Sequence, residues 1–329
     1  MGDILKGKVA VITGSGQGTG RAIAMGFAAQ GCKVVTNNRA PKKKGSQAMS
    51  GAVLTDEDLQ KLSPEDREWI LKEAELENGD AETTAQAIRD AGGEAVACFA
   101  NIADFDDAGR LIQTAIDTYG RIDILVNVAG GFGFSKFEEM TPELFERVTS
   151  VKPKGYFNTM RHAVPHMIKQ GGGRIINTTS RAFMGDVFKH VEYCTANAGV
   201  VGLTRGAAIE LWDRHITVNA FGPWARSRAA YELEMHNKLD SVTIGNAKVP
   251  PASITPTPDK IVPFLVYLAS DKADKVSGTI FTMAGNTISQ HSEPVICNTM
   301  TKQGDWTCEE FMEAAPRFFQ GYKSIADLD

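Results

Sequence analysis

The stretch "KVAVITGSGQGTGRAIAMGFAAQG", residues 8–31, decides the fold of this chain. Residues 8–14 form a short β-rich run, and an alanine-rich helical pattern follows until Gly31 ends it. Between them, glycines recur with the spacing G-x-x-x-G-x-G, which lets the backbone turn tightly and approach a pyrophosphate at a helix N-terminus. An ordinary tight turn is the alternative interpretation. The candidate pyrophosphate-binding residues are Gly14, Ser15, Gly18, Thr19 and Gly20.

The same order of strand and helix continues along the chain. Further strand patterns lie at 33–38, 94–101, 122–130, 173–180, 216–223 and 278–285, and helical patterns at 104–119, 141–170, 192–213 and 258–270. Most of the strand runs are continuously apolar, which is typical of strands covered by helices on both faces. We therefore predict a single-domain α/β fold over residues 1–286, with a Rossmann-type, doubly wound parallel sheet of about seven strands.

Two segments do not fit this alternation. Residues 40–80 form an insertion after the second strand, and within it Ser63 and Pro64 predict the start of a short helix. Residues 287–329 form a C-terminal extension, in which Thr307 followed by acidic residues and an apolar stripe predicts a second helix. We expect that helix to pack on the body of the protein or on a partner subunit.

The bulk composition excludes several classes of partner. The chain has 329 residues and a net charge of −5, which argues against nucleic acid or an anionic membrane as the main partner. Its five cysteines are scattered without C-x-x-C spacing, so we predict reduced thiols and no metal site. The N-terminus has no apolar signal segment, and no run of residues is long and apolar enough to span a membrane. These features predict a cytoplasmic protein.

The end of the second strand bears on cofactor choice. An acid there binds a ribose 2′-hydroxyl, whereas a basic residue accepts a 2′-phosphate. This chain has Asn38 followed by Arg39, so it lacks a carboxylate that would repel the phosphate. The pattern favours NADP(H), with NAD(H) as the alternative if Arg39 is only a solvated loop charge. The basic run 42–44 offers additional attraction for phosphate or is a solvated charge run.

The motifs "TGSGQGTG", "NVAG", "GRIINTTS", Tyr193 and "VNAFGP" occur together, in an order and spacing that resembles the short-chain dehydrogenase/reductase family over roughly residues 6–285. The resemblance implies that Ser180 binds a substrate carbonyl oxygen and that Tyr193 exchanges a proton with it. It implies no metal. It also implies that the adenine, ribose and nicotinamide of the cofactor are contacted by Asn101, Ile102, Asn127, Ala129, Gly130 and Pro223.

A narrower likeness is to the dehydrogenase units of peroxisomal multifunctional enzymes, which oxidise (3R)-hydroxyacyl-CoA. It rests on "VVTNNRA", the insertion after it, "PWARSR" at 223–228 and the long C-terminal tail. Two features depart from that group, because the insertion is longer here and its acidic NAD-type ending is replaced by Asn38 and Arg39.

Two catalytic positions have exchanged residue types relative to the family. The family's lysine four positions after the tyrosine is Asn197 in "YCTANAG", and the family's asparagine in "VNLKG" is Lys152 in "VKPKG". To act near neutrality a tyrosine needs its pKa lowered by about 3 units, or roughly 4 kcal/mol. An amide hydrogen bond contributes only ~0.5–1.5 kcal/mol. A positive charge at about 4 Å contributes roughly 4 kcal/mol at an effective dielectric near 20.

We therefore predict a catalytic set of Lys152, Ser180, Tyr193 and Asn197, in which Lys152 reaches Tyr193 from the neighbouring helix. Pro153 should bend that helix locally and help to aim the side chain. The alternative is that Lys152 is a surface lysine, Asn197 a simple loss, and the protein an inactive cofactor binder.

The predicted substrate is a small-molecule carbonyl or alcohol. The segments 131–135 and 224–255 should form its pocket, and the aromatic residues there predict a bulky, apolar or cyclic ketone. A (3R)-3-hydroxyacyl-CoA is the alternative substrate. The resemblance also implies a homodimer or homotetramer formed through the helices at 141–170 and 192–213. The candidate substrate-binding residues are Phe132, Phe183 and Trp224.

Overall fold

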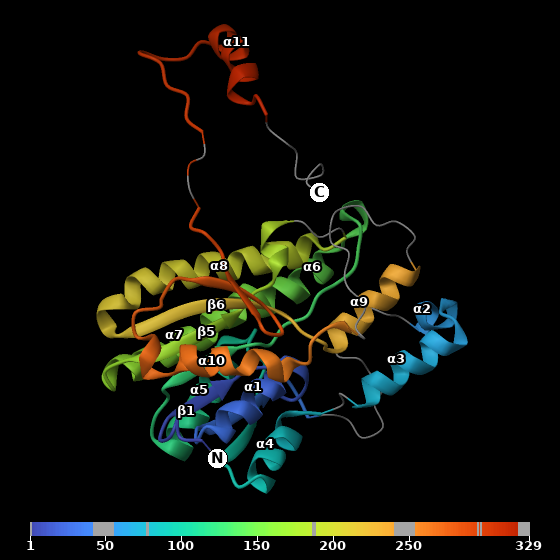
Figure 1. Cartoon of the computed structure of the whole chain (residues 1–329), viewed down its shortest axis with the longest axis vertical. Coiled ribbons are helices and arrows are strands. Elements are labelled where there is room, and N and C mark those ends of the chain that lie inside the picture. The colour runs from blue at the N-terminus through green and yellow to red at the C-terminus, as the bar shows by residue number, and fades with distance from the viewer. Residues whose placement is uncertain are drawn as a thin grey trace.

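The computed structural model describes residues 2–41, 56–76, 79–185, 189–239, 254–294, 296 and 298–321. Their fold is an eight-stranded sheet in the order β3-β2-β1-β4-β5-β6-β7-β8, with helices on both faces (Figure 1). Neighbouring strands from β3 to β7 pair in parallel, and only β8 runs antiparallel to β7. The strands are β1 (Val9–Ile12), β2 (Lys33–Asn38), β3 (Ala95–Phe99), β4 (Ile124–Asn127), β5 (Gly173–Thr178), β6 (Ile216–Trp224), β7 (Ile280–Ala284) and β8 (Thr287–Gln290).

This topology confirms the predicted doubly wound, single-domain α/β fold. Each of the predicted strands is present, and β8 is an additional strand at the start of the C-terminal extension. The strand order reverses between β1 and β4, and ligands of such sheets bind at the carboxyl ends of the strands beside this switch point. The predicted glycine turn follows β1 directly, so it lies at that edge of the sheet.

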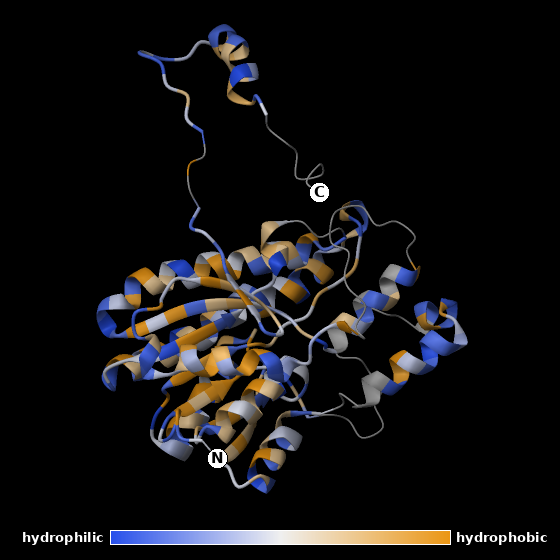
Figure 2. Ribbon diagram, viewed as in Figure 1, coloured by the Kyte–Doolittle hydropathy of each residue, from blue (hydrophilic) through white to orange (hydrophobic). Residues whose placement is uncertain are grey.

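Two apolar cores cover the two faces of the sheet. One buries α1, α4 and α10 against it, and the other buries α5, α7 and α8. Figure 2 shows the apolar sheet between helices whose outer faces are more polar. The helices are α1 (Gly18–Ala29), α2 (Asp56–Lys61), α3 (Pro64–Leu76), α4 (Ala81–Asp90), α5 (Phe105–Tyr119), α6 (Pro142–Thr149), α7 (Tyr156–Lys169), α8 (Val191–Leu211), α9 (Arg228–Leu239), α10 (Val262–Ala269) and α11 (Cys308–Phe318).

The helix predicted at 141–170 is not continuous. α6 and α7 are joined by a π-helical turn, η2 (Ser150–Gly155), in which Lys152 has the extended backbone angles φ −124° and ψ 128°. Pro153 is the physical reason, because it lacks a backbone donor and disfavours helical angles at the residue before it. The predicted local bend is therefore a full interruption of the helix, located at the predicted catalytic lysine.

The insertion contributes α2 and α3, and α3 begins after Ser63 as predicted. The Ser63 hydroxyl accepts a hydrogen bond from the Asp66 backbone amide at 3.1 Å. α3 packs against α9, where the rings of Trp69 and Tyr231 meet edge to face at 5.1 Å. Together they enclose a third apolar cluster, separate from the two cores of the sheet. The basic run 42–44 lies outside the described residues.

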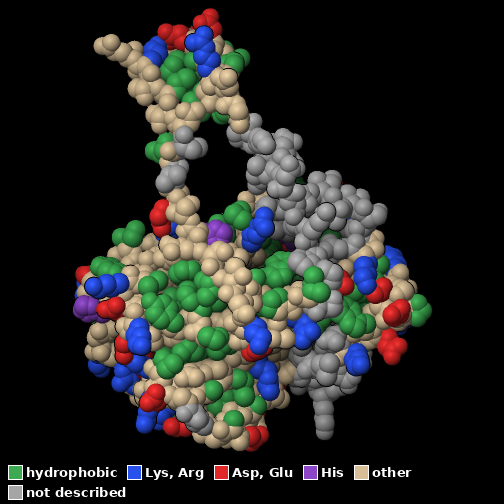
Figure 3. Space-filling model, viewed as in Figure 1, with side chains coloured by type: hydrophobic (Ala, Val, Ile, Leu, Met, Phe, Trp, Pro, Cys, Tyr) green, Lys and Arg blue, Asp and Glu red, His purple; other side chains and the backbone are tan. Residues whose placement is uncertain are grey.

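The C-terminal extension leaves the sheet after β8 and ends in α11. The helix begins with a capping box, as the sequence predicts: the Thr307 hydroxyl accepts from the Glu310 backbone amide, and the Glu310 carboxylate accepts from the Thr307 backbone amide. Figure 1 and Figure 3 show the arm and α11 standing clear of the rounded body. The expectation that this helix packs on the body of its own chain is wrong, and packing on a partner subunit stays a prediction. Within the described part of the chain, no helix is long and apolar enough to cross a membrane.

Candidate active site

The glycine turn after β1 is built from close backbone contacts. Gly14 has φ +62°, and a Cβ there would lie 2.7 Å from the Cα of Ala129. A Cβ at Gly20 would lie 2.2 Å from the Gly14 carbonyl oxygen. Neither position accepts a side chain, so the turn presents backbone to the cofactor edge of the sheet. Gly18 also has a positive φ, and Thr19 follows it at the start of α1.

Ser15 is buried within this turn, and its side chain faces inward. Its hydroxyl donates to the Ile12 carbonyl at 2.8 Å and accepts from the Asn37 amide at 2.8 Å. This pair of hydrogen bonds fixes the turn to the end of β2. Ser15 therefore contributes to a cofactor site by holding the shape of the turn.

The end of β2 lies beside the same turn. The side-chain oxygen of Asn38 is buried without a hydrogen-bond partner in the described structure, and a Cβ at Gly16 would lie 2.1 Å from it. Arg39 is exposed. The N-cap of α4, Asp80, also borders Gly16, since that same Cβ would lie 2.6 Å from the Asp80 Cα. An unpaired buried acceptor suits a donor from a bound ligand, such as a ribose hydroxyl.

The predicted ribose- and adenine-binding residues follow β3 and β4. Asn101 is partly buried and Ile102 fully buried after β3. The Asn127 side chain is fully buried, where its amide donates to Asn177 at 3.0 Å and accepts from Thr159 at 2.8 Å. These bonds cross from β4 to β5 and α7, so the side chain supports the site from inside the core.

Ala129 and Gly130 carry the chain from β4 toward the catalytic residues. The Ala129 carbonyl accepts a hydrogen bond from the Tyr156 phenol at 2.9 Å. Gly130 passes against Lys152, where a Cβ would lie 2.7 Å from the lysine Cε. The glycine therefore makes room for the Lys152 side chain.

Tyr193 and Asn197 lie one turn apart on α8, which is regular through both positions. Ser180 follows β5 and caps the short helix η3 (Arg181–Met184), with its hydroxyl accepting from the Ala182 amide at 3.3 Å. Burial raises the pKa of the Tyr193 phenol, and this outweighs hydrogen bonding from Ser180 and Asn197, which acts to lower it. The structure thus brings the predicted serine, tyrosine and asparagine together.

Lys152 lies at the interruption between α6 and α7 and points into this cluster. It is only 4% exposed, and its Nζ lies 3.4 Å from the Asn197 side-chain oxygen. The same amine lies 6.0 Å from the ring centroid of Tyr193 and 5.6 Å from that of Tyr156. The two residues whose types are exchanged are therefore hydrogen-bonded to each other.

The Lys152 amine is buried without an acid beside it. In the described ranges, no carboxylate lies within ion-pairing distance of it. Burial lowers its pKa from 10.5 to about 7. An amine with this pKa exchanges its proton near neutrality, which is the range in which acid–base catalysis is most effective.

The predicted substrate residues surround the tyrosine to different extents. The ring of Phe132 lies 5.7 Å from that of Tyr193. Phe183 follows Ser180 on η3 and stacks edge to face on His291 of the C-terminal extension at 5.0 Å. Trp224 ends β6 and is partly buried beside Pro223, where it pairs with β7. Phe132 is thus the aromatic residue that the structure brings to the tyrosine ring.

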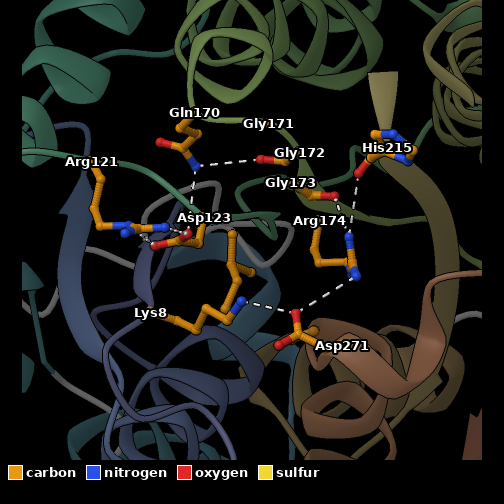
Figure 4. Close-up of a pocket in the computed structure, with 12 residues that line it drawn as sticks. Lys8, Arg121, Asp123, Gln170, Gly171, Gly172, Gly173, Arg174, His215 and Asp271 are labelled. Atoms are coloured by element: carbon orange, nitrogen blue, oxygen red, sulfur yellow. Dashed lines mark hydrogen bonds and ion pairs between the residues drawn. The ribbon is translucent and has the colours of Figure 1, made fainter. Parts of the chain in front are cut away.

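A cavity of about 200 Å³ lies at the opposite edge of the sheet (Figure 4). Its charged groups come from the starts of β1, β4 and β5 and from the short helix η7 (Asp271–Ala273) after α10, and they pair with one another. Lys8 contacts Asp271 at 2.8 Å, and the Arg121 guanidinium contacts both carboxylate oxygens of Asp123, at 2.6 and 2.8 Å. This cavity lies where the strands begin, whereas the glycine turn lies where β1 ends.

Sequence reasoning missed three parts of the site. Tyr156 supports both Ala129 and Lys152, and its spacing of four residues from Lys152 was an available signal. Asp80 reaches the glycine turn from the far end of the insertion, which no local pattern indicates. His190 and Glu192 are buried beside Tyr193, although charged residues next to a helix start normally predict exposure. In the described part of the chain, no group of His, Cys, Asp and Glu is arranged to hold a metal.

Comparison with known proteins agrees with the geometry. The sequence profile of the short chain dehydrogenase family matches residues 60–228. The chain is 32% identical over 285 residues to the peroxisomal hydratase-dehydrogenase-epimerase of Saccharomyces cerevisiae, covering 87% of this chain and 27% of that protein. It is 28% identical to the 3-oxoacyl-[acyl-carrier-protein] reductase FabG of Thermotoga maritima, covering 86% and 99% of the two chains. A short chain dehydrogenase from Mycobacterium avium matches with a TM-score of 0.75 and 30% identity, over 98% and 97% of the chains.

The chain therefore belongs to the short-chain dehydrogenase family, and it is an oxidoreductase of that family that uses a nicotinamide cofactor. It spans about a quarter of the length of its yeast relative.

Proposed function

We propose that this protein interconverts a ketone and a secondary alcohol, with Tyr193 as the acid or base and Lys152 as its source of positive charge. One observation carries the proposal. Lys152 is a buried amine without a carboxylate partner among the described residues, and it lies against Asn197 and the Tyr193 ring. Perturbed amines of this kind cluster at functional sites because burying one is costly.

The residues of the cofactor edge fit a nicotinamide dinucleotide. The glycine turn leaves no space for a Cβ at Gly14 or Gly20, which keeps its backbone open to a pyrophosphate. The unpaired Asn38 oxygen suits a ribose hydroxyl. A bound nicotinamide cofactor would supply or accept the hydride, and the protein would orient it and manage the proton.

The proton route uses three side chains. In the reductive direction, the Ser180 hydroxyl donates a hydrogen bond to the carbonyl oxygen, and the Tyr193 phenol gives that oxygen its proton. The Lys152 amine lies 6.0 Å from the Tyr193 ring centroid. Over a separation of this order and at an effective dielectric near 20, its ammonium form would stabilise the resulting phenolate by about 3 kcal/mol. The ammonium then returns a proton to the phenolate, and the neutral amine that remains takes up a proton from solvent. Oxidation of the alcohol runs the same steps in reverse, and it requires the neutral amine.

We propose a preference for NADP(H) on the basis of Arg39, which is exposed beside the end of β2 and available to a 2′-phosphate. NAD(H) is the second candidate, favoured by Asp80, whose backbone borders the glycine turn at the same place. The ratio of kcat/KM for NADPH and NADH decides between them. Arg39→Ala should lower that ratio if the guanidinium binds the phosphate, and it should leave the ratio unchanged otherwise.

The substrate we propose is a bulky, apolar or cyclic ketone. The Phe132 ring lies against Tyr193, and Trp224 and Phe183 are partly buried. These aromatic side chains would form an apolar pocket wall for such a molecule. The second candidate is a (3R)-3-hydroxyacyl-CoA, which the likeness to the yeast hydratase-dehydrogenase-epimerase and to the acyl-carrier-protein reductase favours. A homodimer or homotetramer and a cytoplasmic location stay predictions.

The experiment is a screen of cyclic ketones and 3-hydroxyacyl-CoA thioesters with each cofactor. Wild type is compared with Tyr193→Phe, and Tyr267→Phe, a partly exposed tyrosine of α10, is the control. We expect turnover of at least one carbonyl class, a loss of about 10²–10⁴-fold in Tyr193→Phe and none in the control. Cofactor binding without turnover of any carbonyl, or full activity in Tyr193→Phe, would overturn the proposal and leave an inactive cofactor binder.

A further inference from the structure

Glu192 is a fully buried carboxylate immediately before Tyr193. Its side chain is 0% exposed, and its Oε1 accepts a hydrogen bond from the Gly133 backbone amide at 2.8 Å. Gly133 lies between Phe132 and Phe134, in the loop after β4 that is expected to line the substrate pocket. The carboxylate therefore ties that loop to the first turn of α8.

A second residue of the same segment reinforces the tie. His190 is 3% exposed, and its Nδ1 lies 3.6 Å from the Glu192 Oε1. Its ring meets those of Phe132 at 5.4 Å and Phe134 at 5.3 Å, both edge to face. The imidazole thus fills the space between the two phenylalanines and faces the carboxylate that holds their loop.

Two further contacts, both farther from Tyr193, also join this loop to the segment before α8. The Ser135 amide donates to the Lys189 carbonyl at 3.0 Å, and the Lys189 amine lies 4.9 Å over the Phe134 ring. Loop 132–135 and segment 189–192 therefore run against each other as one unit. That unit places the ring of Phe132 5.7 Å from the ring of Tyr193.

Burying a carboxylate is costly, and this one is not fully compensated. The Glu192 Oε2 and the His190 Nδ1 are buried without a hydrogen-bond partner in the described structure. Burial acts to raise the pKa of Glu192, but the neighbouring His190 ring and the hydrogen bond from the Gly133 amide outweigh it and lower the pKa, so the group is ionised at neutral pH. If the residue at position 192 served only for packing, an apolar side chain would fill the space without the free-energy cost of burying a charge.

We propose that Glu192 is a positioning residue of the reaction. Its carboxylate fixes the loop of Phe132 and Phe134 against the start of α8, and so sets the wall that orients the substrate carbonyl toward Tyr193. The proposal rests on the proposed function of Tyr193. Because the wall acts on the body of the substrate, a bulky ketone depends on it and a small ketone reaches the phenol without it.

The test compares a bulky cyclic ketone with a small acyclic ketone in three variants. Glu192→Ala removes the carboxylate, Glu192→Gln keeps an oxygen that accepts from Gly133, and Glu210→Ala is the control, an exposed glutamate on the same helix. We expect Glu192→Ala to raise KM for the bulky ketone about tenfold or more, and to change kcat/KM for the small ketone by less than about threefold. Glu192→Gln should recover most of the loss, and the control should match wild type.

A merely structural role would move thermal stability without separating the two ketones. If Glu192→Ala lowers Tm but affects both substrates equally, or affects neither, the proposal is wrong. If Glu192→Ala does not fold, Glu192→Asp replaces it, because the shorter side chain keeps the charge but retracts from Gly133. A Tyr193→Phe variant measured in parallel separates the two hypotheses: its full activity overturns the proposed function, whereas its inactivity with unaffected Glu192 variants overturns only the role of Glu192.

Discussion

The two edges of the sheet differ in whether their cationic side chains are paired with carboxylates. At the edge where the strands begin, Lys8 and Arg121 each lie within 2.8 Å of a carboxylate, and Figure 4 shows these pairs lining one cavity. At the edge where the strands end, Lys152 is buried, and its amine meets an amide oxygen and two aromatic rings. Charge at the first edge is arranged for stability. At the second edge, the Lys152 amine can gain or lose its proton near neutral pH.

This difference indicates that Lys152 has a chemical role and not a stabilising one. Burial lowers the pKa of its amine from 10.5 to about 7, so the protonated form destabilises the fold by roughly 4–5 kcal/mol. A methionine of similar length would avoid that loss. A residue that costs stability of this size is retained for its chemistry, and the chemistry within reach is the proton of Tyr193.

The largest predicted effect is on stability. Lys152→Met should raise the free energy of unfolding by about 4 kcal/mol at pH 6. The folded-state pKa is depressed below that of the unfolded chain, which therefore binds more protons between pH 7 and 10.5. The destabilisation is complete below pH 7 and vanishes as pH rises to 10.5, so the gain from the substitution should vanish there too. Denaturant unfolding across this pH range measures it.

The control for this prediction is Lys154→Met, because Lys154 is exposed on the same turn. Its free energy of unfolding should match wild type at every pH. A Lys152→Met protein that is no more stable than wild type at pH 6 would show that the amine is hydrated or paired, and the contrast between the two edges would not hold.

The next effect is on catalysis. Lys152→Met should lower kcat/KM about 100-fold, because it removes about 3 kcal/mol of phenolate stabilisation by an amine 6.0 Å from the Tyr193 ring centroid. Lys154→Met should keep the full rate. Steady-state kinetics with the ketone found in the substrate screen measures both, and equal rates for the two variants would remove Lys152 from the mechanism.

At the opposite edge, Asp123→Asn should lower stability and leave catalysis unchanged. The Asp123 carboxylate is 6% exposed, accepts from the Val9 amide at 2.9 Å and binds the Arg121 guanidinium through both oxygens. Replacing it with an amide weakens charge-assisted bonds, for an expected loss of about 2 kcal/mol. Thermal or denaturant unfolding together with kcat/KM tests this, and a change in kcat/KM at constant stability would contradict the separation of the two edges.

The smallest predicted effect is a rescue. The double variant Lys152→Asn with Asn197→Lys restores the arrangement usual in the family, and it should be about tenfold more active than Lys152→Asn alone. Recovery would be partial because the interruption at Pro153 positions residue 152 for a long side chain. If the double variant is no better than the single one, the two positions are not equivalent sources of charge.

Much of the fold was predictable from the sequence, for identifiable reasons. Apolar runs and the glycine turn are local signals, and they located the strands and the start of α1. The capping residues Ser63 and Thr307 located α3 and α11 in the same way. The extent of the break at Pro153 was not predictable, because proline also occurs within helices, as Pro165 does in α7.

The site was predictable in part. A resemblance to the family brought Ser180, Tyr193 and Asn197 together, and the requirement for a charge pointed to Lys152. The contacts of Asp80 with Gly16 and of Glu192 with Gly133 join segments that are distant in sequence, so no local sequence pattern predicts them. The course of α11 away from the body was not predictable either, since an apolar stripe does not say which surface will cover it.

The most direct test of the account is the pH dependence of kcat/KM in both directions, for wild type and Lys152→Met. In the proposed mechanism, reduction requires the Lys152 ammonium and oxidation requires the neutral amine. Wild-type reduction should therefore fall, and oxidation should rise, as the pH passes through about 7. Both inflections should be absent from Lys152→Met. If the inflections near pH 7 remain in Lys152→Met, the titrating group is another residue and the assigned role of Lys152 is wrong.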